Sequence, residues 1–232
     1  PEKDVQGHHT VWAHVLLTVD QAAALSKIMG FDEAKRLTLL LAALYHDVGK
    51  AKTTRWDLKH GRMTVTSNGH DIQSERMTRR AFKRQRIFSW RGSDLAILTP
   101  LLIRTHHRAC ELWQNKDDVT RKAFNRLAAE VKGEIELVVA LDAADRAGRK
   151  TRLVSGLGRE ARWLLAKFEE LRVNRETIKP LVMGRHLIDL GIAPGPEMGK
   201  MLKKLYQLQL DGIFETAADG VREAERLAGR KA

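Results

Sequence analysis

Apolar side chains recur every three or four positions along most of the chain, which is the spacing of one face of an α-helix. The first clear segment covers residues 10–28, with apolar members Val11, Trp12, Val15, Leu16, Val19 and Ala23. Gly30 ends this segment, and Asp32 is a suitable N-cap for a second helix that runs to Tyr45. The pattern therefore predicts a mostly helical protein.

One segment departs from helical spacing. Between Thr53 and Thr66, alternating apolar residues flank His60 and Gly61, which favours a short β-hairpin. Helical spacing then resumes, and Ser93-Asp94 is a good start for one of the helices. The further helices are expected over residues 70–86, 93–113, 118–132, 134–149 and, after a glycine-bearing break at 155–158, up to about 173.

The local sequence pattern of the chain changes near residue 175. Lys179-Pro180 and the segment 193–196 separate two short helices, and a last helix closes the chain. We predict an all-α fold with two parts. A helical bundle with a small β-hairpin insertion covers residues 1–174, and a small C-terminal helical segment covers residues 175–232.

Composition narrows the class of protein. Hydrophobic residues make up 43% of the chain and charged residues 30%, which is typical of a soluble globular protein. No stretch approaches the roughly 20 apolar residues of a membrane helix, so no membrane partner is expected. The single Cys110 excludes an internal disulfide and a multi-cysteine zinc site, and it favours the reducing cytoplasm. No Gly-x-x-x-x-Gly-Lys-[Ser/Thr] loop is present, which argues against ATPase or kinase chemistry.

The charge of the chain favours a polyanionic partner. Lysine and arginine number 41 against 29 acids, for a net charge of +12. The helix predicted over residues 70–86 has no acid after Glu75, and its basic residues share one broad face. We predict that RNA binds there and at the end of the helix over 134–149. The alternative is a solvated basic surface. The candidate RNA-binding residues are Arg76, Arg79, Arg80, Lys83, Arg84 and Arg149.

Histidines and aspartates suggest the chemistry. Four predicted helices each supply a histidine, and a fifth supplies aspartates within an apolar stretch. Because carboxylates facing a core are costly unless paired or bound to a metal, these residues predict a divalent metal site. A single buried histidine could instead be a hydrogen-bonded core residue, and Asp142 could pair with Arg146. Spacing alone does not choose between neighbouring candidates. The candidates are His14, His46, Asp47, His70, His106 or His107, and Asp142 or Asp145.

The segment Tyr45-His46-Asp47-Val48-Gly49-Lys50 resembles the signature of the HD phosphohydrolase superfamily. Nearly the whole chain resembles the HD-containing bacterial tRNA nucleotidyltransferases, which are the CCA-adding enzymes and their poly(A) polymerase relatives. Because the matching segments occur in the same order, chance is a poor explanation. The other matching segments are Val11–His14, Gly69–Asp71, Arg104–His106, Ala144–Arg149 and Gly184–Pro196.

The resemblance implies a set of roles. It selects Asp145 over Asp142 and, less firmly, His106 over His107. The ligands of one ion would be His14, His46, Asp47 and Asp145. A second ion or a phosphate would be held by His70 and His106, and Lys50 would bind a phosphate oxygen. The implied catalytic residues are His46, Asp47, Lys50, His70 and His106. One or two ions of Mn²⁺, Mg²⁺, Ni²⁺ or Co²⁺ would serve as cofactor.

The function implied is a metal-dependent phosphohydrolase, a phosphodiesterase or phosphatase, acting on RNA ends such as 2′,3′-cyclic phosphates and binding tRNA or its 3′ end. In the family a nucleotide-adding head precedes this region, and nothing before Val11 supplies it. We therefore expect the head to lie outside this chain, or the chain to be a free-standing HD protein. Two alternatives remain: a non-catalytic tRNA-binding module, and an HD phosphohydrolase of free nucleotides.

Overall fold

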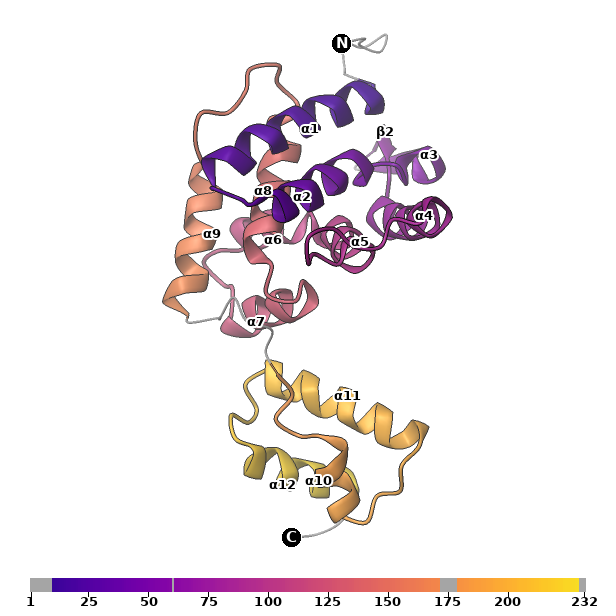
Figure 1. Cartoon of the computed structure of the whole chain (residues 1–232), viewed down its shortest axis with the longest axis vertical. Coiled ribbons are helices and arrows are strands. Elements are labelled where there is room, and N and C mark those ends of the chain that lie inside the picture. Colours follow the sequence, from indigo (N-terminus) through magenta and orange to yellow (C-terminus); the bar gives the residue numbers. More distant parts are fainter. Residues whose placement is uncertain (1–9, 60, 172–178, 230–232) are drawn as a thin grey trace.

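The computed structural model describes residues 10–59, 61–171 and 179–229 (Figure 1). Within these ranges the protein is helical apart from one β-hairpin, as the sequence predicts. The elements of the first part are α1 (Val11–Ile28), α2 (Glu33–Tyr45), α3 (Lys50–Thr53), β1 (Arg55–Lys59), β2 (Arg62–Thr66), α4 (His70–Gln85), α5 (Leu95–Thr105), α6 (Arg108–Gln114), α7 (Arg121–Glu130), α8 (Ile135–Ala147) and α9 (Arg159–Glu170). The elements of the second part are α10 (Gly184–Asp189), α11 (Pro196–Leu210) and α12 (Ala217–Leu227).

The first two helices begin and end as the local sequence predicts. The Thr10 hydroxyl accepts a hydrogen bond from the Ala13 N–H, which caps α1, and the Asp32 carboxylate accepts one from the Lys35 N–H, which caps α2. Gly30, with φ of +65°, turns the chain between the two helices. The caps therefore fix the direction in which α1 and α2 approach the centre of the bundle.

Helix α8 is the central helix of the bundle. It packs against α1, α2, α5, α6 and α9, and residues 137–141 are all buried. Because an all-round apolar helix must be enclosed by others, this stretch explains the bundle architecture. The same helix carries two buried aspartates, Asp142 and Asp145, into the interior. Figure 1 shows α8 between α1, α2 and α9.

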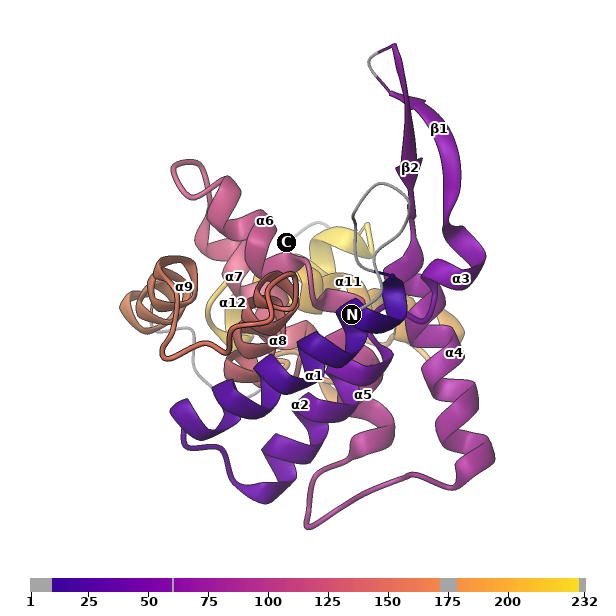
Figure 2. The same cartoon turned by 90° about the horizontal axis from the view of Figure 1, so that it is seen from above.

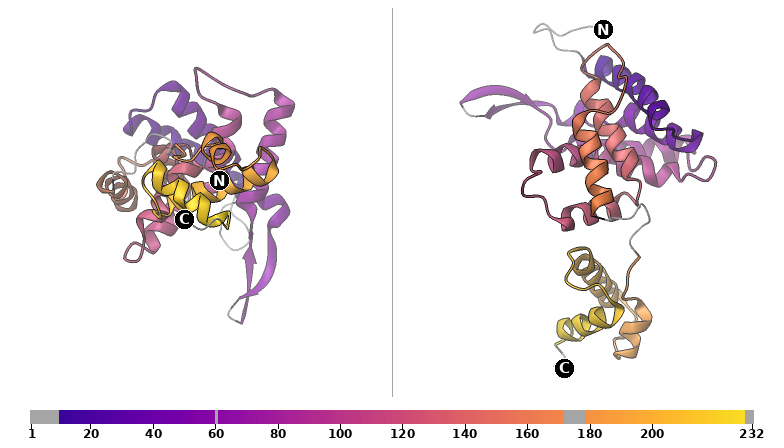
Figure 3. Two further views of the ribbon diagram at one scale, coloured as in Figure 1. Left: turned by 90° about the horizontal axis from the view of Figure 1, so that it is seen from below. Right: turned by 90° about the vertical axis from the view of Figure 1, so that its left-hand side faces the viewer.

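The predicted hairpin is confirmed. Strands β1 and β2 pair antiparallel with Trp56 opposite Val65 and Leu58 opposite Met63, and all four side chains are exposed. Figures 2 and 3 show that the hairpin projects away from the helical bundle. Its base joins α3 to α4, so it follows directly on the segment that carries His46 and Asp47. His60 lies outside the described residues.

The hydrophobic core consists of two separate clusters. One lies within residues 22–168 and the other joins α10, α11 and α12. The two parts are in contact at α7, where Asp211 pairs with Lys122 and Arg126 at 2.8 Å each. Figure 3 shows α10–α12 beyond α7. The domain boundary predicted between residues 174 and 175 lies outside the described residues.

Four details differ from the sequence predictions. The helix expected over residues 93–113 is broken by a turn at His106-His107. The Thr105 hydroxyl and the His106 ring bond to carbonyl oxygens of the last turn of α5, and these side-chain bonds favour its termination. A short helix, α3, follows the HD segment and was not predicted, and α11 is long rather than short. In α1, Trp12 is 63% exposed although it belongs to the apolar pattern. Among the described helices, none is both long and apolar enough to cross a membrane.

Candidate metal centre

The structure brings the six predicted metal ligands together from five parts of the bundle. His14 comes from α1, and His46 and Asp47 directly follow α2. The other three lie at the start of α4, at the end of α5 and near the end of α8; they are His70, His106 and Asp145. Two groups of side chains each offer three ligand atoms within 4.8 Å of one another. The first group is His14, His46 and Asp145, and the second is His70, His106 and His107.

Asp47 lies between the two groups. Its Oδ2 atom is 3.3 Å from His46 Nε2 and 3.6 Å from His14 Nε2. Its Oδ1 atom is 3.4 Å from His70 Nε2. One carboxylate therefore directs an oxygen toward each group, an arrangement that suits either one ion or a pair of ions linked through Asp47.

Three histidines are oriented by the same backbone contact. The Nδ1 atoms of His46, His70 and His106 lie 2.8, 2.8 and 2.6 Å from the carbonyl oxygen three residues earlier in the chain. Because a carbonyl only accepts hydrogen bonds, Nδ1 must carry the proton and donate it. When its Nε2 atom carries no proton, each ring presents the Nε2 lone pair to the cluster, which is the orientation of metal-binding histidines.

Several atoms of the cluster lack hydrogen-bond partners within the described residues. They are His46 Nε2, His106 Nε2 and Asp47 Oδ1, and all three are buried. Buried polar atoms are rarely left unsatisfied, so this convergence calls for a further partner. A divalent cation fits, since every unsatisfied atom is a potential electron-pair donor and the set combines nitrogen with carboxylate oxygen.

The carboxylates of the cluster are ionised. Burial would raise the pKa of Asp47, but contacts with His46 and the charges of His46 and Lys50 hold it well below its usual range. Burial would likewise raise the pKa of Asp145, yet contacts with His14 and His46 hold that pKa far below the ordinary value. At neutral pH both residues can therefore bind a cation without losing a proton.

The histidines differ in protonation. Burial, together with the charges of His107 and His46, lowers the pKa of His106 to about 3, so this ring is neutral at pH 7. Burial would also lower the pKa of His46, but contacts with Asp145 and Asp47 outweigh it and raise the pKa to about 9. Without a metal, the proton on His46 partly offsets the two carboxylates.

The proton on His46 predicts that folding stability and metal affinity depend on pH. In the chelated protein the raised pKa of His46 contributes stability that is fully present below about pH 6.5 and is lost as the pH rises through about 9.

Metal binding must displace the proton on His46. Calorimetric titration with Mn²⁺ in two buffers of different ionisation enthalpy should show release of about one proton per ion near pH 7.5. Apparent affinity should rise by roughly tenfold per pH unit between pH 7 and 8.5. Binding without proton release would contradict the assignment of His46 as a ligand.

Gly49 holds the HD segment against α4. Its N–H donates to the buried Ser74 hydroxyl at 2.8 Å. A Cβ at this position would collide with the His70 carbonyl oxygen and would lie 2.6 Å from Ser74 N. The close approach positions Asp47 beside His70.

Gly49→Ala is therefore expected to destabilise the fold by roughly 1–3 kcal/mol and to weaken metal binding, because the backbone must move apart. Thermal unfolding and metal titration measure the two effects. The matched control is Gly199→Ala in α11, where nothing in the described part of the chain, apart from the helix's own backbone, lies within 4 Å of an added Cβ. The control should leave metal binding unchanged and should not lower the unfolding temperature. Equal effects from the two variants would contradict the packing argument.

The structure distinguishes between neighbours that spacing left open. Asp145 Oδ1 lies 2.9 Å from His14 Nε2, whereas Asp142 Oδ2 pairs with Arg146 at 2.8 Å and belongs to neither ligand group of the described residues. Burial raises the pKa of Asp142 to about 7. The HD resemblance therefore selected the aspartate that lies in the cluster.

The family resemblance preferred His106 over His107, yet His107 also lies in the cluster. Its Nε2 atom is 3.1 Å from His70 Nε2, and its ring centroid is 3.7 Å from that of His106. Burial and the charge of His70 lower the pKa of His107. The adjacent histidines are visible in the sequence, but the turn between α5 and α6 that lets both side chains reach the cluster was not predicted.

Lys50 lies at the edge of the cluster. Its Nζ atom is 2.6 Å from Asp47 Oδ2, and its side chain is 28% exposed. The predicted phosphate-binding lysine is thus paired with a predicted metal ligand. An ion bound to Asp47 would compete for this carboxylate, and Lys50 would then be available to an anion.

The basic residues predicted on α4 are all exposed. Arg79 pairs with Glu75 at 3.0 Å. Arg80 and Arg84 line a hollow of about 330 Å³ together with Tyr45 and Val48. Val48, which lines the same hollow, directly follows Asp47 in the chain, and α4 itself begins with His70. Arg149 is exposed just beyond α8, separate from the α4 residues.

A helical bundle with a His/Asp cluster of this kind defines an HD-type protein. Comparison with protein families agrees, since the model described as HD domain matches residues 11–147. The chain therefore belongs to the HD domain family.

Two curated proteins are similar over most of the chain. The CC-adding tRNA nucleotidyltransferase of Thermus thermophilus is 29% identical over 213 residues, a match that covers 90% of this chain and 43% of that protein. The A-adding tRNA nucleotidyltransferase of Deinococcus radiodurans is 28% identical over 196 residues, covering 83% and 42%. The chain thus spans less than half the length of these relatives. No solved structure gives a significant match.

Proposed function

We propose that this chain is a metal-dependent phosphohydrolase, a phosphodiesterase or phosphatase, that acts on RNA ends such as 2′,3′-cyclic phosphates. The observation that carries the proposal is the convergence of unsatisfied histidine and aspartate atoms from separate helices on one small region. HD family membership supports the reaction class. The similarity to two tRNA nucleotidyltransferases supports tRNA, or its 3′ end, as the RNA. A tRNA substrate would place the protein in the cytoplasm.

The residues suit a site of this kind. When bound, one or two ions of Mn²⁺, Mg²⁺, Ni²⁺ or Co²⁺ would activate water near neutral pH and offset negative charge on phosphoryl oxygens. The proposed ligands of one ion are His14, His46, Asp47 and Asp145, and His70 and His106, joined by His107, would hold a second ion or the phosphate. The described cluster contains no thiolate, which argues against a structural zinc site.

Lys50 and the exposed arginines would position the substrate. Lys50 lies at the open edge of the cluster and can bind a phosphoryl oxygen as a point charge. The basic face of α4 lies on the helix that begins with His70, and it can follow the phosphate backbone away from the reacting end. The site would therefore take a phosphorylated terminus with several further nucleotides behind it.

The substrate class can be tested by comparing two molecules with the same reacting group. An oligoribonucleotide that ends in a 2′,3′-cyclic phosphate should be hydrolysed with a lower KM than free 2′,3′-cyclic AMP at low salt. The difference should shrink as salt rises, because backbone contacts release counterions. Equal KM values at all salt concentrations would contradict RNA ends and favour a phosphohydrolase of free nucleotides.

The basic face also supports a second candidate function, a tRNA-binding module without catalysis. In that case the HD fold holds tRNA for a nucleotide-adding head outside this chain. Metal removal and substitution of His46 or Asp47 would then leave RNA binding unchanged, and no hydrolysis would be seen with any ion.

A further inference from the structure

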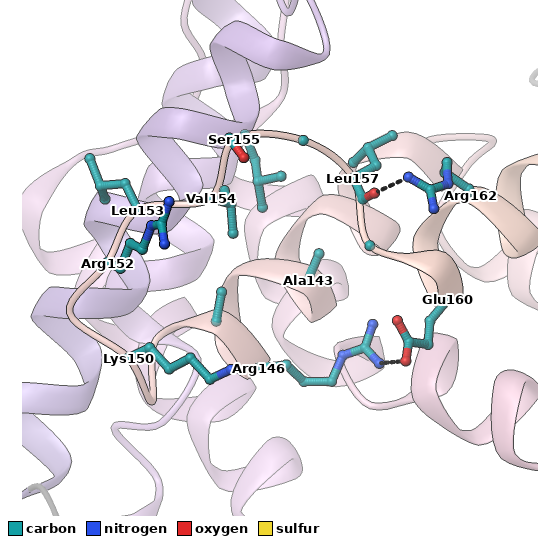
Figure 4. Close-up of a pocket in the computed structure, with 14 residues that line it drawn as sticks. Ala143, Arg146, Lys150, Arg152, Leu153, Val154, Ser155, Leu157, Glu160 and Arg162 are labelled. Carbon is teal, nitrogen blue, oxygen red and sulfur yellow. Dashed lines mark hydrogen bonds and ion pairs between the residues drawn. The ribbon is translucent and has the colours of Figure 1, made fainter.

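A second hollow lies outside the metal centre. It has a volume of about 670 Å³ and is lined mainly by the end of α8, the loop that follows α8 and the first turn of α9 (Figure 4). The residues that line the hollow include the acid Glu160 and four cations. The cations are Arg146, Lys150, Arg152 and Arg162. The excess of positive charge favours an anionic ligand.

The loop that carries two of these cations is fixed by a buried side chain. Gln21 of α1 is fully buried, and its Nε2 atom donates to the carbonyl oxygens of Lys150 at 3.3 Å and Arg152 at 2.9 Å. Its Oε1 atom accepts from the Val154 N–H at 2.9 Å. Three bonds from one buried amide hold the loop backbone in place. The backbone from which both cationic side chains project is therefore held in position before any ligand binds.

The four cations differ in whether they already form ion pairs or hydrogen bonds within the protein. Arg146 pairs with Asp142 at 2.8 Å and lies 3.9 Å from Glu160, and Arg162 donates to the Leu157 carbonyl at 2.8 Å. Lys150 and Arg152 are exposed, and neither forms an ion pair within the described part of the chain. The Nε atom of Arg146 is buried without a described acceptor. Two free cations and one unsatisfied donor thus remain at the cavity.

The N-terminus of helix α9 adds further positive charge at the cavity. Its N-cap is Gly158, which provides no side-chain acceptor for the N–H groups of the first turn. Gly158 and Glu160 both line the cavity, so the helix begins at the cavity wall. Uncapped N–H groups and the helix dipole together favour an anion, most often a phosphate. Glu160 in the first turn of α9 offsets part of this positive charge, whereas the four cations of the lining add to it.

We propose that this cavity binds the phosphate group of a nucleotide, at a site separate from the metal centre. The volume lies within the roughly 300–1,000 Å³ of small-ligand pockets, so a sugar and base fit beside the phosphate. Ala143, Ala147 and Leu157 supply apolar wall for them. Asp145 and Arg146 are consecutive on α8 and leave the helix about 100° apart. One helix therefore contributes to both sites.

The nucleotide can be free or part of an RNA strand, and binding measurements separate the two. The protein is first treated with a chelator, so that hydrolysis and the metal centre play no part. It is then titrated at low salt with AMP, with inorganic phosphate and with a short oligoribonucleotide. This design makes the result independent of the proposed phosphohydrolase activity.

The test variant is Lys150→Glu with Arg152→Glu. The matched control is Arg36→Glu with Arg121→Glu, which changes net charge equally at two exposed sites on α2 and α7. The test variant should lose about tenfold or more in affinity for AMP, while the control should lose less than about threefold. Thermal unfolding checks that both variants are folded.

The outcomes are distinct. Tighter binding of the oligoribonucleotide than of AMP, lost in the test variant, would identify an RNA strand as the source of the phosphate. Binding of AMP that the oligoribonucleotide does not displace would identify a free nucleotide. Equal losses in the two variants would show a net-charge effect and overturn the proposal. Failure of the chelated wild-type protein to bind any of the three ligands would also overturn it.

Discussion

Asp145→Asn is expected to abolish metal-dependent hydrolysis while leaving the fold intact. The Oδ1 atom of Asp145 lies 2.9 Å from His14 Nε2 and 3.6 Å from His46 Nε2, so it belongs to the first ligand group. Asparagine has nearly the same shape, but it removes one of the two negative charges of the cluster. Turnover of 2′,3′-cyclic AMP should fall by about 100-fold or more. Bound Mn²⁺, measured after equilibrium dialysis, should fall in parallel.

Asp142→Asn provides a matched control. Both aspartates are buried on α8, but Asp142 is paired with Arg146 and lies outside both ligand groups. Because burial raises its pKa to about 7, replacing it removes a charge that the interior disfavours. The control should keep its metal and its turnover. If Asp142→Asn lost metal while Asp145→Asn kept it, the assignment of the cluster would be wrong.

Removing three cations of α4 should give the largest effect on RNA binding. Arg80, Lys83 and Arg84 are exposed, and none forms an ion pair within the described residues. Replacing all three with alanine should weaken tRNA binding by roughly tenfold to 100-fold near 0.1 M salt. The slope of log affinity against log salt should become shallower by about 2–3, with each lost phosphate contact contributing about 0.7–0.9. Filter binding over a salt series measures both quantities.

The control for this experiment comes from the same region. Arg79 and Arg104 each pair with Glu75 at 3.0 Å, so their charges are already offset. Replacing both with alanine should change the salt slope much less than the triple substitution. An unchanged slope in the triple variant, with tRNA still bound, would place the RNA on another surface.

Much of the fold could be predicted from local signals. Asp32 caps α2, Gly30 turns the chain before it, and alternating residues around Gly61 form the hairpin. These features depend on neighbouring residues, and a pattern in the sequence records them directly. The exposure of Trp12 could not be predicted in this way, because periodicity marks an apolar face without showing what covers it.

The residues of the candidate site could be predicted from the sequence only in part. His46-Asp47 was found because an adjacent pair at a helix end is unusual, and the family resemblance chose Asp145 over Asp142. The resemblance preferred His106 over His107, and spacing could not predict that both rings reach the cluster, because the helix was expected to continue past them. The contact of Lys50 with Asp47 depends on the unpredicted helix α3. The break at residues 106–107 and the start of α3 are set by side-chain bonds and tertiary packing, which spacing does not record.

Hydrolysis of 2′,3′-cyclic AMP tests the central claim most directly. The protein is chelated, assayed, and assayed again after addition of Mn²⁺, Mg²⁺, Ni²⁺ or Co²⁺, with Asp47→Ala as the control. The proposed phosphohydrolase predicts no turnover in the chelated protein, recovery with at least one ion, and no recovery in Asp47→Ala. Absence of turnover with all four ions, in a protein that still binds tRNA, would contradict the claim and support a tRNA-binding module.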